Sequence, residues 1–115
     1  MLYYKIKLLN LISVCPYLFL SIKKLKVFWS DSRFKDSEQS LRAWYAEAKN
    51  AKWSNPDDIK KQYRNASIIS NNRVVFNIKG NEYRLVVSLR YEFKIVYIRF
   101  IGTHKQYDKI NAEEI

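Results

Sequence analysis

The residues best suited to chemistry lie in one block of the sequence, from Val74 to Ile110. Arginine presents a rigid fork of N–H donors that matches two phosphate oxygens, and lysine supplies a compact positive charge. The block holds both residue types, together with aromatic and amide side chains and the only histidine of the chain. The candidates are Asn77, Lys79, Arg84, Tyr97, Arg99 and His104. They would suit phosphate binding if the fold brought them to one surface.

Length and charge define the classes of partner. At 115 residues the chain can form one compact domain, and 48% hydrophobic residues are enough for a core. The net charge is +10, from 21 Lys and Arg against 11 Asp and Glu. This excess favours a polyanionic partner: nucleic acid, the ribosome, a membrane face or an acidic protein. With 3 Trp, 9 Tyr and 6 Phe, some rings must reach the surface, where they could stack on bases.

The cysteine and histidine content excludes several kinds of site. Cys15 is the only cysteine, so an intramolecular disulfide, a thiolate metal cluster and a CxxC redox pair are all impossible. His104 is the only histidine, which excludes a multi-histidine metal centre. We expect no metal and no cofactor, and a reducing cytoplasm fits this composition best.

The N-terminal stretch allows more than one interpretation. Lys5 and Lys7 precede an apolar run at residues 8–20, in the order of a secretory signal peptide. The run is shorter and more interrupted than the ~20 apolar residues of a transmembrane helix, and no small-residue cleavage site follows it. We therefore expect residues 1–20 to be an extension or the result of a mis-assigned start. Residues 21–115 would form the domain, with no membrane partner.

Helical segments are predicted in the first half of the domain. Apolar residues at helical spacing indicate a helix from Ile22 to Trp29. A second helix is expected to begin near Ser37, with Ser37 or Asp36 as its N-cap. A third begins within residues 53–59, where Pro56 would occupy the first helical position.

The second half is predicted to form strands. They span Arg73–Ile78, Tyr83–Leu89 and Lys94–Ile101, and Gly80-Asn81 would form a tight two-residue hairpin turn in which Asn81 takes a positive φ. The polar segment from Gly102 to Ile115 is expected to be a short irregular arm. The predicted fold class is α+β, a small antiparallel sheet with two to three N-terminal helices packed on one face.

The hairpin turn determines which side chains share a face of this sheet, because paired residues point to the same side. The predicted pairs are Ile78 with Tyr83, Asn77 with Arg84, Phe76 with Leu85, and Val74 with Val87. For the third strand we predict pairing of Leu85 with Phe100 and of Val87 with Ile98. The core would then receive Val96, Ile98 and Phe100, and the open face Tyr97, Arg99 and Ile101.

This register brings polar side chains together on the open face. Asn77, Arg84, Tyr97 and Arg99 would converge there, and Lys79 and His104 would lie at strand ends nearby. The arrangement suits phosphate binding. The alternative is an ordinary solvated sheet face whose charges serve solubility, and the pattern alone does not separate the two.

Two segments of the chain resemble a known family. Val75-Phe76-Asn77-Ile78-Lys79-Gly80-Asn81-Glu82-Tyr83-Arg84-Leu85 and Ile98-Arg99-Phe100-Ile101-Gly102-Thr103-His104-Lys105-Gln106-Tyr107-Asp108-Lys109-Ile110 resemble the HigB toxins of type II toxin–antitoxin systems, which are related to the RelE-like ribonucleases. Leu41–Tyr45 and Ala51–Trp53 resemble the helical half of that family. The resemblance covers residues 21–114 and implies a RelE-like fold, in which residues 19–22 would supply the opening strand.

The resemblance also implies an activity and partners. Such toxins cleave mRNA, typically on the ribosome, and an adjacent helix-turn-helix antitoxin similar to HigA neutralises them. The reaction needs no metal, because a ribose 2′-oxygen attacks the neighbouring phosphate and leaves a 2′,3′-cyclic phosphate and a 5′-hydroxyl. The alternative is a non-catalytic module that binds RNA or the ribosome through the same basic sheet.

The implied chemistry assigns expected roles to the candidates. Arg84 and Arg99 would stabilise the developing phosphorane charge, and His104 would carry a proton, since histidine titrates near neutral pH. Tyr107 would stack on a base or share the proton transfer. The remaining RNA-binding candidates are Asn77, Lys79, Tyr97, Lys105 and Lys109.

Overall fold

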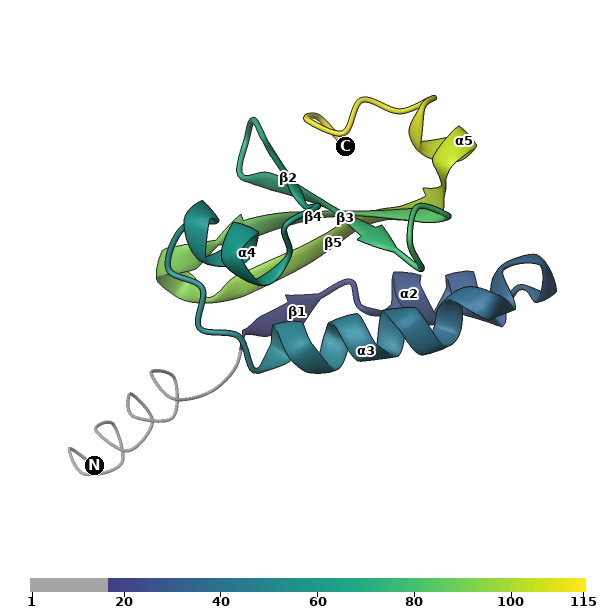
Figure 1. Cartoon of the computed structure of the whole chain (residues 1–115), viewed down its shortest axis with the longest axis horizontal. Coiled ribbons are helices and arrows are strands. Elements are labelled where there is room, and N and C mark those ends of the chain that lie inside the picture. The colour runs from purple at the N-terminus through teal and green to yellow at the C-terminus, as the bar shows by residue number, and fades with distance from the viewer. Residues whose placement is uncertain (1–16) are drawn as a thin grey trace.

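The computed structural model describes residues 17–115, and Figure 1 shows them as a single sheet with the long helices on one side. The sheet order is β1-β5-β4-β3-β2. The strands are β1 (Leu18–Leu20), β2 (Ser67–Ile69), β3 (Arg73–Ile78), β4 (Tyr83–Arg90) and β5 (Ile95–Thr103). All neighbours are antiparallel except β1, which runs parallel to β5. The α+β class is confirmed, with a mixed rather than purely antiparallel sheet.

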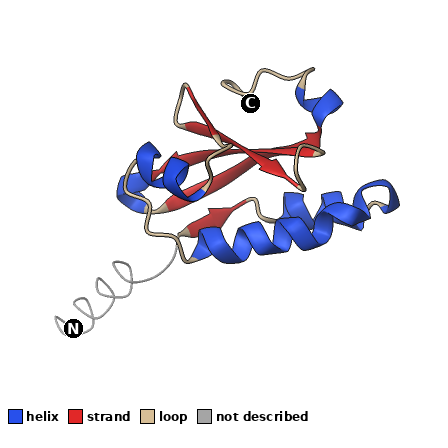
Figure 2. Ribbon diagram, viewed as in Figure 1, coloured by secondary structure: helices blue, strands red, loops and turns tan. Residues whose placement is uncertain are grey.

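The three predicted helices form, together with two 3-10 helices and a short final helix that the sequence analysis did not predict (Figure 2). They are α2 (Lys23–Ser30), the 3-10 helix η1 (Ser32–Ser37), α3 (Glu38–Lys49), α4 (Pro56–Gln62), the 3-10 helix η2 (Tyr91–Phe93) and α5 (His104–Tyr107). At α4, Asn55 caps the helix by accepting a hydrogen bond from the Asp58 amide at 3.1 Å, and Pro56 takes the first turn. Ser37 precedes α3 as expected, but its hydroxyl donates to the Phe34 carbonyl instead of capping.

The main core lies between the sheet and the helices. The inner faces of α2, α3 and α4 place Leu25, Leu41 and Ile59 against Phe76 and Leu85 of the sheet, and all five are almost fully buried. The core face of the β3–β4 hairpin is the predicted one. Within residues 17–115, no helix is long and apolar enough to cross a membrane.

The segment just before α2 belongs to the folded domain. Tyr17 is 2% exposed, and its hydroxyl donates to the Trp53 carbonyl. Leu18, Phe19 and Leu20 pair with β5, and the Phe19 ring packs edge-on against Tyr45. The strand expected at residues 19–22 therefore forms one residue earlier, inside the stretch assigned to an extension. Residues 1–16, including Lys5, Lys7 and Cys15, lie outside the described residues.

The β3–β4 register is confirmed, but its turn differs from the prediction. All four predicted pairs, from Ile78 with Tyr83 to Val74 with Val87, are present. The loop between the strands holds four residues, and the positive φ angles fall on Lys79 and Gly80 rather than on Asn81. The prediction was wrong here because a two-residue type I′ turn requires positive φ at both of its central residues, whereas a four-residue loop does not require positive φ at Asn81.

The β4–β5 register contains a bulge that the sequence analysis missed. Val87 pairs with Ile98 as predicted, but Val86 rather than Leu85 pairs with Phe100, because Arg99 is an extra residue in β5. Beyond the bulge the faces exchange. Phe100 therefore lies on the outer face, and Ile101 packs against the main core, the reverse of the prediction.

The C-terminal segment is ordered and covers part of the sheet, contrary to the predicted irregular arm. β5 continues to Thr103, and α5 follows directly. Figure 1 shows α5 and the final residues on the side of the sheet opposite the long helices. There Ala112 is 8% exposed and, together with Tyr107 and Ile110, covers Val75 and Val86.

Candidate functional site

The face of the sheet opposite the long helices, called the outer face below, carries three rows of side chains across β3, β4 and β5. The first is Asn77–Arg84–Gly102, the second Val75–Val86–Phe100, and the third Arg73–Ser88–Tyr97. The first and third rows are polar, whereas the second is apolar and covered by the C-terminal segment. The polar residues of this face therefore form two groups, one on each side of the covered row along the strands.

Arg84 is the central residue of the first group. It pairs with Gly102 and Asn77, and one of its terminal nitrogens donates to the Asn81 carbonyl at 3.1 Å. The Asn77 amide reaches the Asn65 carbonyl at 3.5 Å. Since Gly102 brings no side chain to the row, the guanidinium of Arg84 is the only cation in it.

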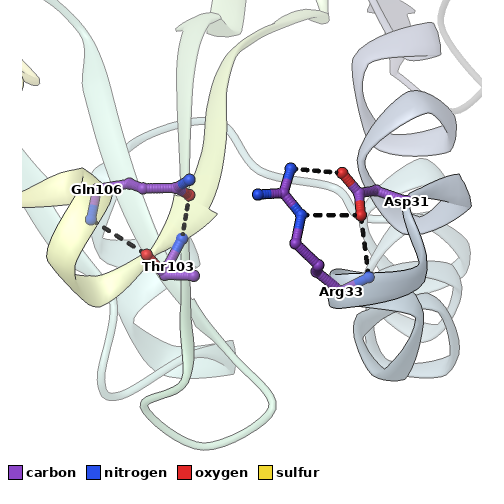
Figure 3. Close-up of polar contacts among 4 residues, drawn as sticks. All are labelled: Asp31, Arg33, Thr103 and Gln106. Carbon is purple, nitrogen blue, oxygen red and sulfur yellow. Dashed lines mark hydrogen bonds and ion pairs between the residues drawn. The ribbon is translucent and has the colours of Figure 1, made fainter.

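His104 begins α5 two residues beyond that row. Its amide donates to the Glu82 carbonyl across the sheet end at 3.3 Å. The turn is secured by a capping box, in which Thr103 accepts from the Gln106 amide and Gln106 accepts from the Thr103 amide (Figure 3). The His104 ring is exposed, and its Nε2 lies 3.7 Å from Asp108 Oδ1.

The other C-terminal candidates lie on or beside α5. The centre of the half-buried Tyr107 ring lies 6.5 Å from the centre of the Phe100 ring, so Tyr107 packs against the β5 end of the covered row. Lys105 and Lys109 are exposed. Lys105 and Tyr107 therefore lie on the same helix as His104, and Lys109 follows its end.

Lys79 points elsewhere. Its Nζ contacts Asp36 of η1 at 2.6 Å and Glu82 at 3.6 Å, and Tyr83 also donates to Asp36. Hydrogen bonds from Lys79 and Tyr83 lower the pKa of Asp36. Burial, and then the Asp36 hydrogen bond, raise the pKa of Tyr83 to about 12. Lys79 thus ties the hairpin to the helical layer and is not aimed at the outer face.

A second loop contact of this kind holds η1 at its start. Asp31 accepts from the backbone amide and the guanidinium of Arg33 (Figure 3). These hydrogen bonds lower the pKa of Asp31 to about 2. Arg33 is therefore occupied by an acid on its own turn.

Tyr97 belongs to the third row, and the side chain of the bulge residue Arg99 reaches that row. Arg99 Nε donates to Ser88 Oγ at 2.9 Å, and its guanidinium lies 4.8 Å from the centre of the Tyr97 ring. Arg84 and Ser88 are four residues apart on β4, which corresponds to about 13 Å along the strand. Arg84 and Arg99 share a face, as predicted, but they do not share a site.

The sequence analysis missed three residues of this second group. Arg73 and Ser88 pair with each other, and Ser88 pairs with Tyr97. Arg90 lies two residues beyond Ser88 and is exposed. Strand alternation was the signal that could have found them, because it puts all three on the face of Tyr97.

Comparison with known proteins supplies the family. The HigB toxin family, described as the RelE-like toxic component of a toxin-antitoxin system, matches residues 37–110. The chain belongs to the HigB toxin family. The HigB match includes α3, the whole β3–β4 hairpin, β5 and α5, which together carry the first group and the covered row.

Curated HigB relatives match over a shorter stretch. The mRNA interferase toxin HigB of Escherichia coli (strain K12) is 47% identical over 38 residues, which are 33% of this chain and 36% of that protein. The mRNA interferases HigB of Escherichia coli O157:H7 and Shigella flexneri match with the same values. The matched stretch spans about a third of the length of these relatives.

Proposed function

We propose that this chain is the toxin of a type II system and acts as a metal-independent endoribonuclease that cleaves mRNA. Membership of the HigB family supports a toxin, and the curated relatives are named mRNA interferases. The observation that carries the proposal is the pairing of Arg84 with Gly102, two residues before the exposed His104. This pairing brings a guanidinium and an imidazole to the same end of the outer face.

The proposed reaction divides among Arg84 and the C-terminal candidates His104, Lys105, Tyr107 and Lys109. The ribose 2′-oxygen attacks phosphorus, its proton leaves, and the bond to the 5′-oxygen breaks as that oxygen gains a proton. Arg84 would donate to the non-bridging oxygens as charge develops on them. His104 would move a proton, and Tyr107 would share this transfer or stack on a base. Lys105 and Lys109 would contact the RNA backbone.

Arg99 and Lys79 take other places in this proposal. Because about 13 Å of strand separates the two polar rows, we assign Arg99 and Tyr97 to binding of RNA away from the reacting phosphate. Asn77 remains beside Arg84 as an RNA contact. Lys79 would reach RNA only after leaving Asp36, so we assign it a structural role first.

The proposed partners are those of a translation-dependent toxin. We infer that the substrate is mRNA on the ribosome, in the cytoplasm, and that a helix-turn-helix antitoxin similar to HigA neutralises the toxin. Co-expression with the product of an adjacent small gene should restore growth. Purified toxin should cleave mRNA faster when ribosomes translate it than when the same mRNA is naked.

Growth of a bacterial host tests the nuclease directly. Induction of the wild type should arrest growth and shorten mRNA. Arg84→Ala and His104→Ala should each lower the cleavage rate by about a hundredfold or more, since each removes charge stabilisation or proton transfer. Lys61→Ala, at an exposed lysine of α4, is the matched control and should stay toxic.

The possible results separate the alternatives. If the wild type leaves growth and mRNA intact while it still binds RNA, the chain is a non-catalytic RNA- or ribosome-binding module. Equal toxicity of Arg84→Ala and His104→Ala would show that the reacting site is elsewhere. Products with a 2′,3′-cyclic phosphate and a 5′-hydroxyl, formed equally with and without a chelator, would support the metal-independent mechanism.

A further inference from the structure

Three arginines surround a pocket at the end of the outer face that lies away from His104. Arg73, Arg90 and Arg99 line it together with Ser88 and Tyr97, and its volume is about 200 Å³. The other lining residues are Asn71, Asn72 and Leu89, so the lining contains no acidic residue. Three like charges around one concavity repel each other unless an anion lies between them.

Arg99 is held in position by its neighbours. The hydrogen bond from Nε to Ser88 and the stack on Tyr97 orient the plane of the guanidinium. Within residues 17–115, no partner is found for either of its terminal nitrogens, so the donors that form the fork of an arginine remain for a ligand. Ser88, only 6% exposed, thus aims the cation at the pocket.

The guanidinium of Arg73 is held by main-chain hydrogen bonds, so it contributes positive charge to the pocket but has fewer free donors for a ligand. Its terminal nitrogens donate to the Asn71 carbonyl at 2.9 Å and to a main-chain oxygen of Ile115 at 2.6 Å, and its Nε is buried without a partner among the described residues. Burial, and after it the charge of Arg99, lower the pKa of Arg73. Both effects disfavour the charged form of a guanidinium that lies close to a second cation.

We propose that this pocket is a second RNA subsite, which binds a backbone phosphate several nucleotides from the phosphate that reacts at Arg84. The inference rests on the proposed function for the identity of the polyanion. The pocket occurs on the same face as Arg84 and His104, and the bidentate fork of Arg99 matches a phosphodiester. Arg90, exposed at the rim, supplies the second contact.

The spacing predicts a dependence on RNA length. The two polar rows are about 13 Å apart, which corresponds to about four stacked nucleotides at a rise of ~3.4 Å. A stacked RNA of about three nucleotides is shorter than this distance, whereas one of about ten nucleotides exceeds it. The pocket therefore contributes to the binding of the longer RNA only.

Fluorescence anisotropy with 2′-O-methyl RNA, which cannot be cleaved, tests the subsite. Arg90→Ala and Arg99→Lys should each weaken binding of the ten-nucleotide RNA by roughly tenfold, because a charge-assisted contact or its bidentate geometry is lost. Arg90→Ala should also reduce the slope of log K against log salt by about 0.7. Binding of the three-nucleotide RNA should not change. Lys61→Ala is the matched control, and thermal unfolding of each variant checks the fold.

The outcomes separate this inference from the nuclease proposal. Unchanged binding of the long RNA by both variants, or equal loss for long and short RNA, would overturn the subsite. Displacement of the long RNA by poly-glutamate as readily as by unlabelled RNA would show a site for acidic protein instead. Because the RNA is not cleaved, a wild type that binds as described but never cuts RNA would refute the nuclease and leave the subsite standing.

Discussion

A single extra residue divides the candidate site. Arg99 is the bulged residue of β5, and it turns Phe100 to the outer face and Ile101 to the core. Phe100 then completes the apolar row between the two polar groups. A bulge places one more residue on one strand than on its partner, so the faces of all later residues exchange. The chemistry expected of four converging side chains is therefore shared between two places.

Gly102 is a position on the outer face with no room for a Cβ atom. A Cβ at this position would lie 2.5 Å from Phe100 Cζ and 2.7 Å from Gln106 Oε1. We predict that Gly102→Ala lowers the free energy of unfolding by about 1–3 kcal/mol, because it displaces the ring or breaks the capping box of α5. Urea denaturation followed by circular dichroism measures the change.

A double-mutant cycle identifies the clash. Leucine has no atom at the Cζ position, so the cost of Gly102→Ala should be smaller in a Phe100→Leu background than in the wild type. An equal cost in both backgrounds would show that the Phe100 ring is not the obstacle.

At the scale of elements, the carboxylate of Asp36 in η1 links η1 to the β3–β4 hairpin by accepting two hydrogen bonds from it. Asp36 accepts from Lys79 and from Tyr83, residues on either side of the hairpin loop. The Tyr83 ring also packs edge-on against Phe28 of α2. This contact places Lys79 in the helical layer, which explains why a lysine at a strand end is absent from the outer face.

The Asp36 contact predicts a pH-dependent stability. The folded state lowers the pKa of this carboxyl, so its contribution is present above the ordinary value of 3.8 and is lost as the pH falls below it. Asp36→Asn should have a lower melting temperature than the wild type at neutral pH. The difference should shrink as the pH falls below that value.

A carboxylate without such a contact provides the control. No described cation contacts the Glu114 side chain, so Glu114→Gln should leave the melting temperature near that of the wild type at neutral pH. A gap between Asp36→Asn and the wild type that stays constant from neutral pH to strongly acidic pH would contradict the assignment.

At the scale of the whole molecule, the start of the fold lies before α2. Tyr17 and β1 close the edge of the sheet beside β5 and cover the Trp53 side of the core. Their removal would expose Trp53 and the first residues of β5.

Two truncated chains test this placement. A protein beginning at Ser21 should be less stable than one beginning at Tyr17 by about 3 kcal/mol or more, because it loses buried aromatic side chains. Chemical denaturation of both chains measures the difference. Tyr17→Phe, which keeps the ring and loses the hydrogen bond, should cost only about 1 kcal/mol. Equal stability of the two truncated chains would mean that β1 is dispensable.

The sequence by itself determined the local features of this protein. Helix periodicity and Pro56 located α2, α3 and α4, and strand alternation placed Asn77 and Arg84 opposite each other on the outer face. The resemblance of residues 75–85 and 98–110 indicated the family. These features are encoded by neighbouring residues and by a short hairpin, so they can be recognised without a tertiary structure.

Only the tertiary structure decided which polar side chains share a site. The bulge at Arg99, the cover formed by Ala112 and the contact of Lys79 with Asp36 depend on residues distant in sequence or on one extra residue in a strand. Alternation records on which face a residue lies, but it does not record what covers that face or where the register shifts. That is why one predicted phosphate site became two groups of residues at opposite ends of the sheet.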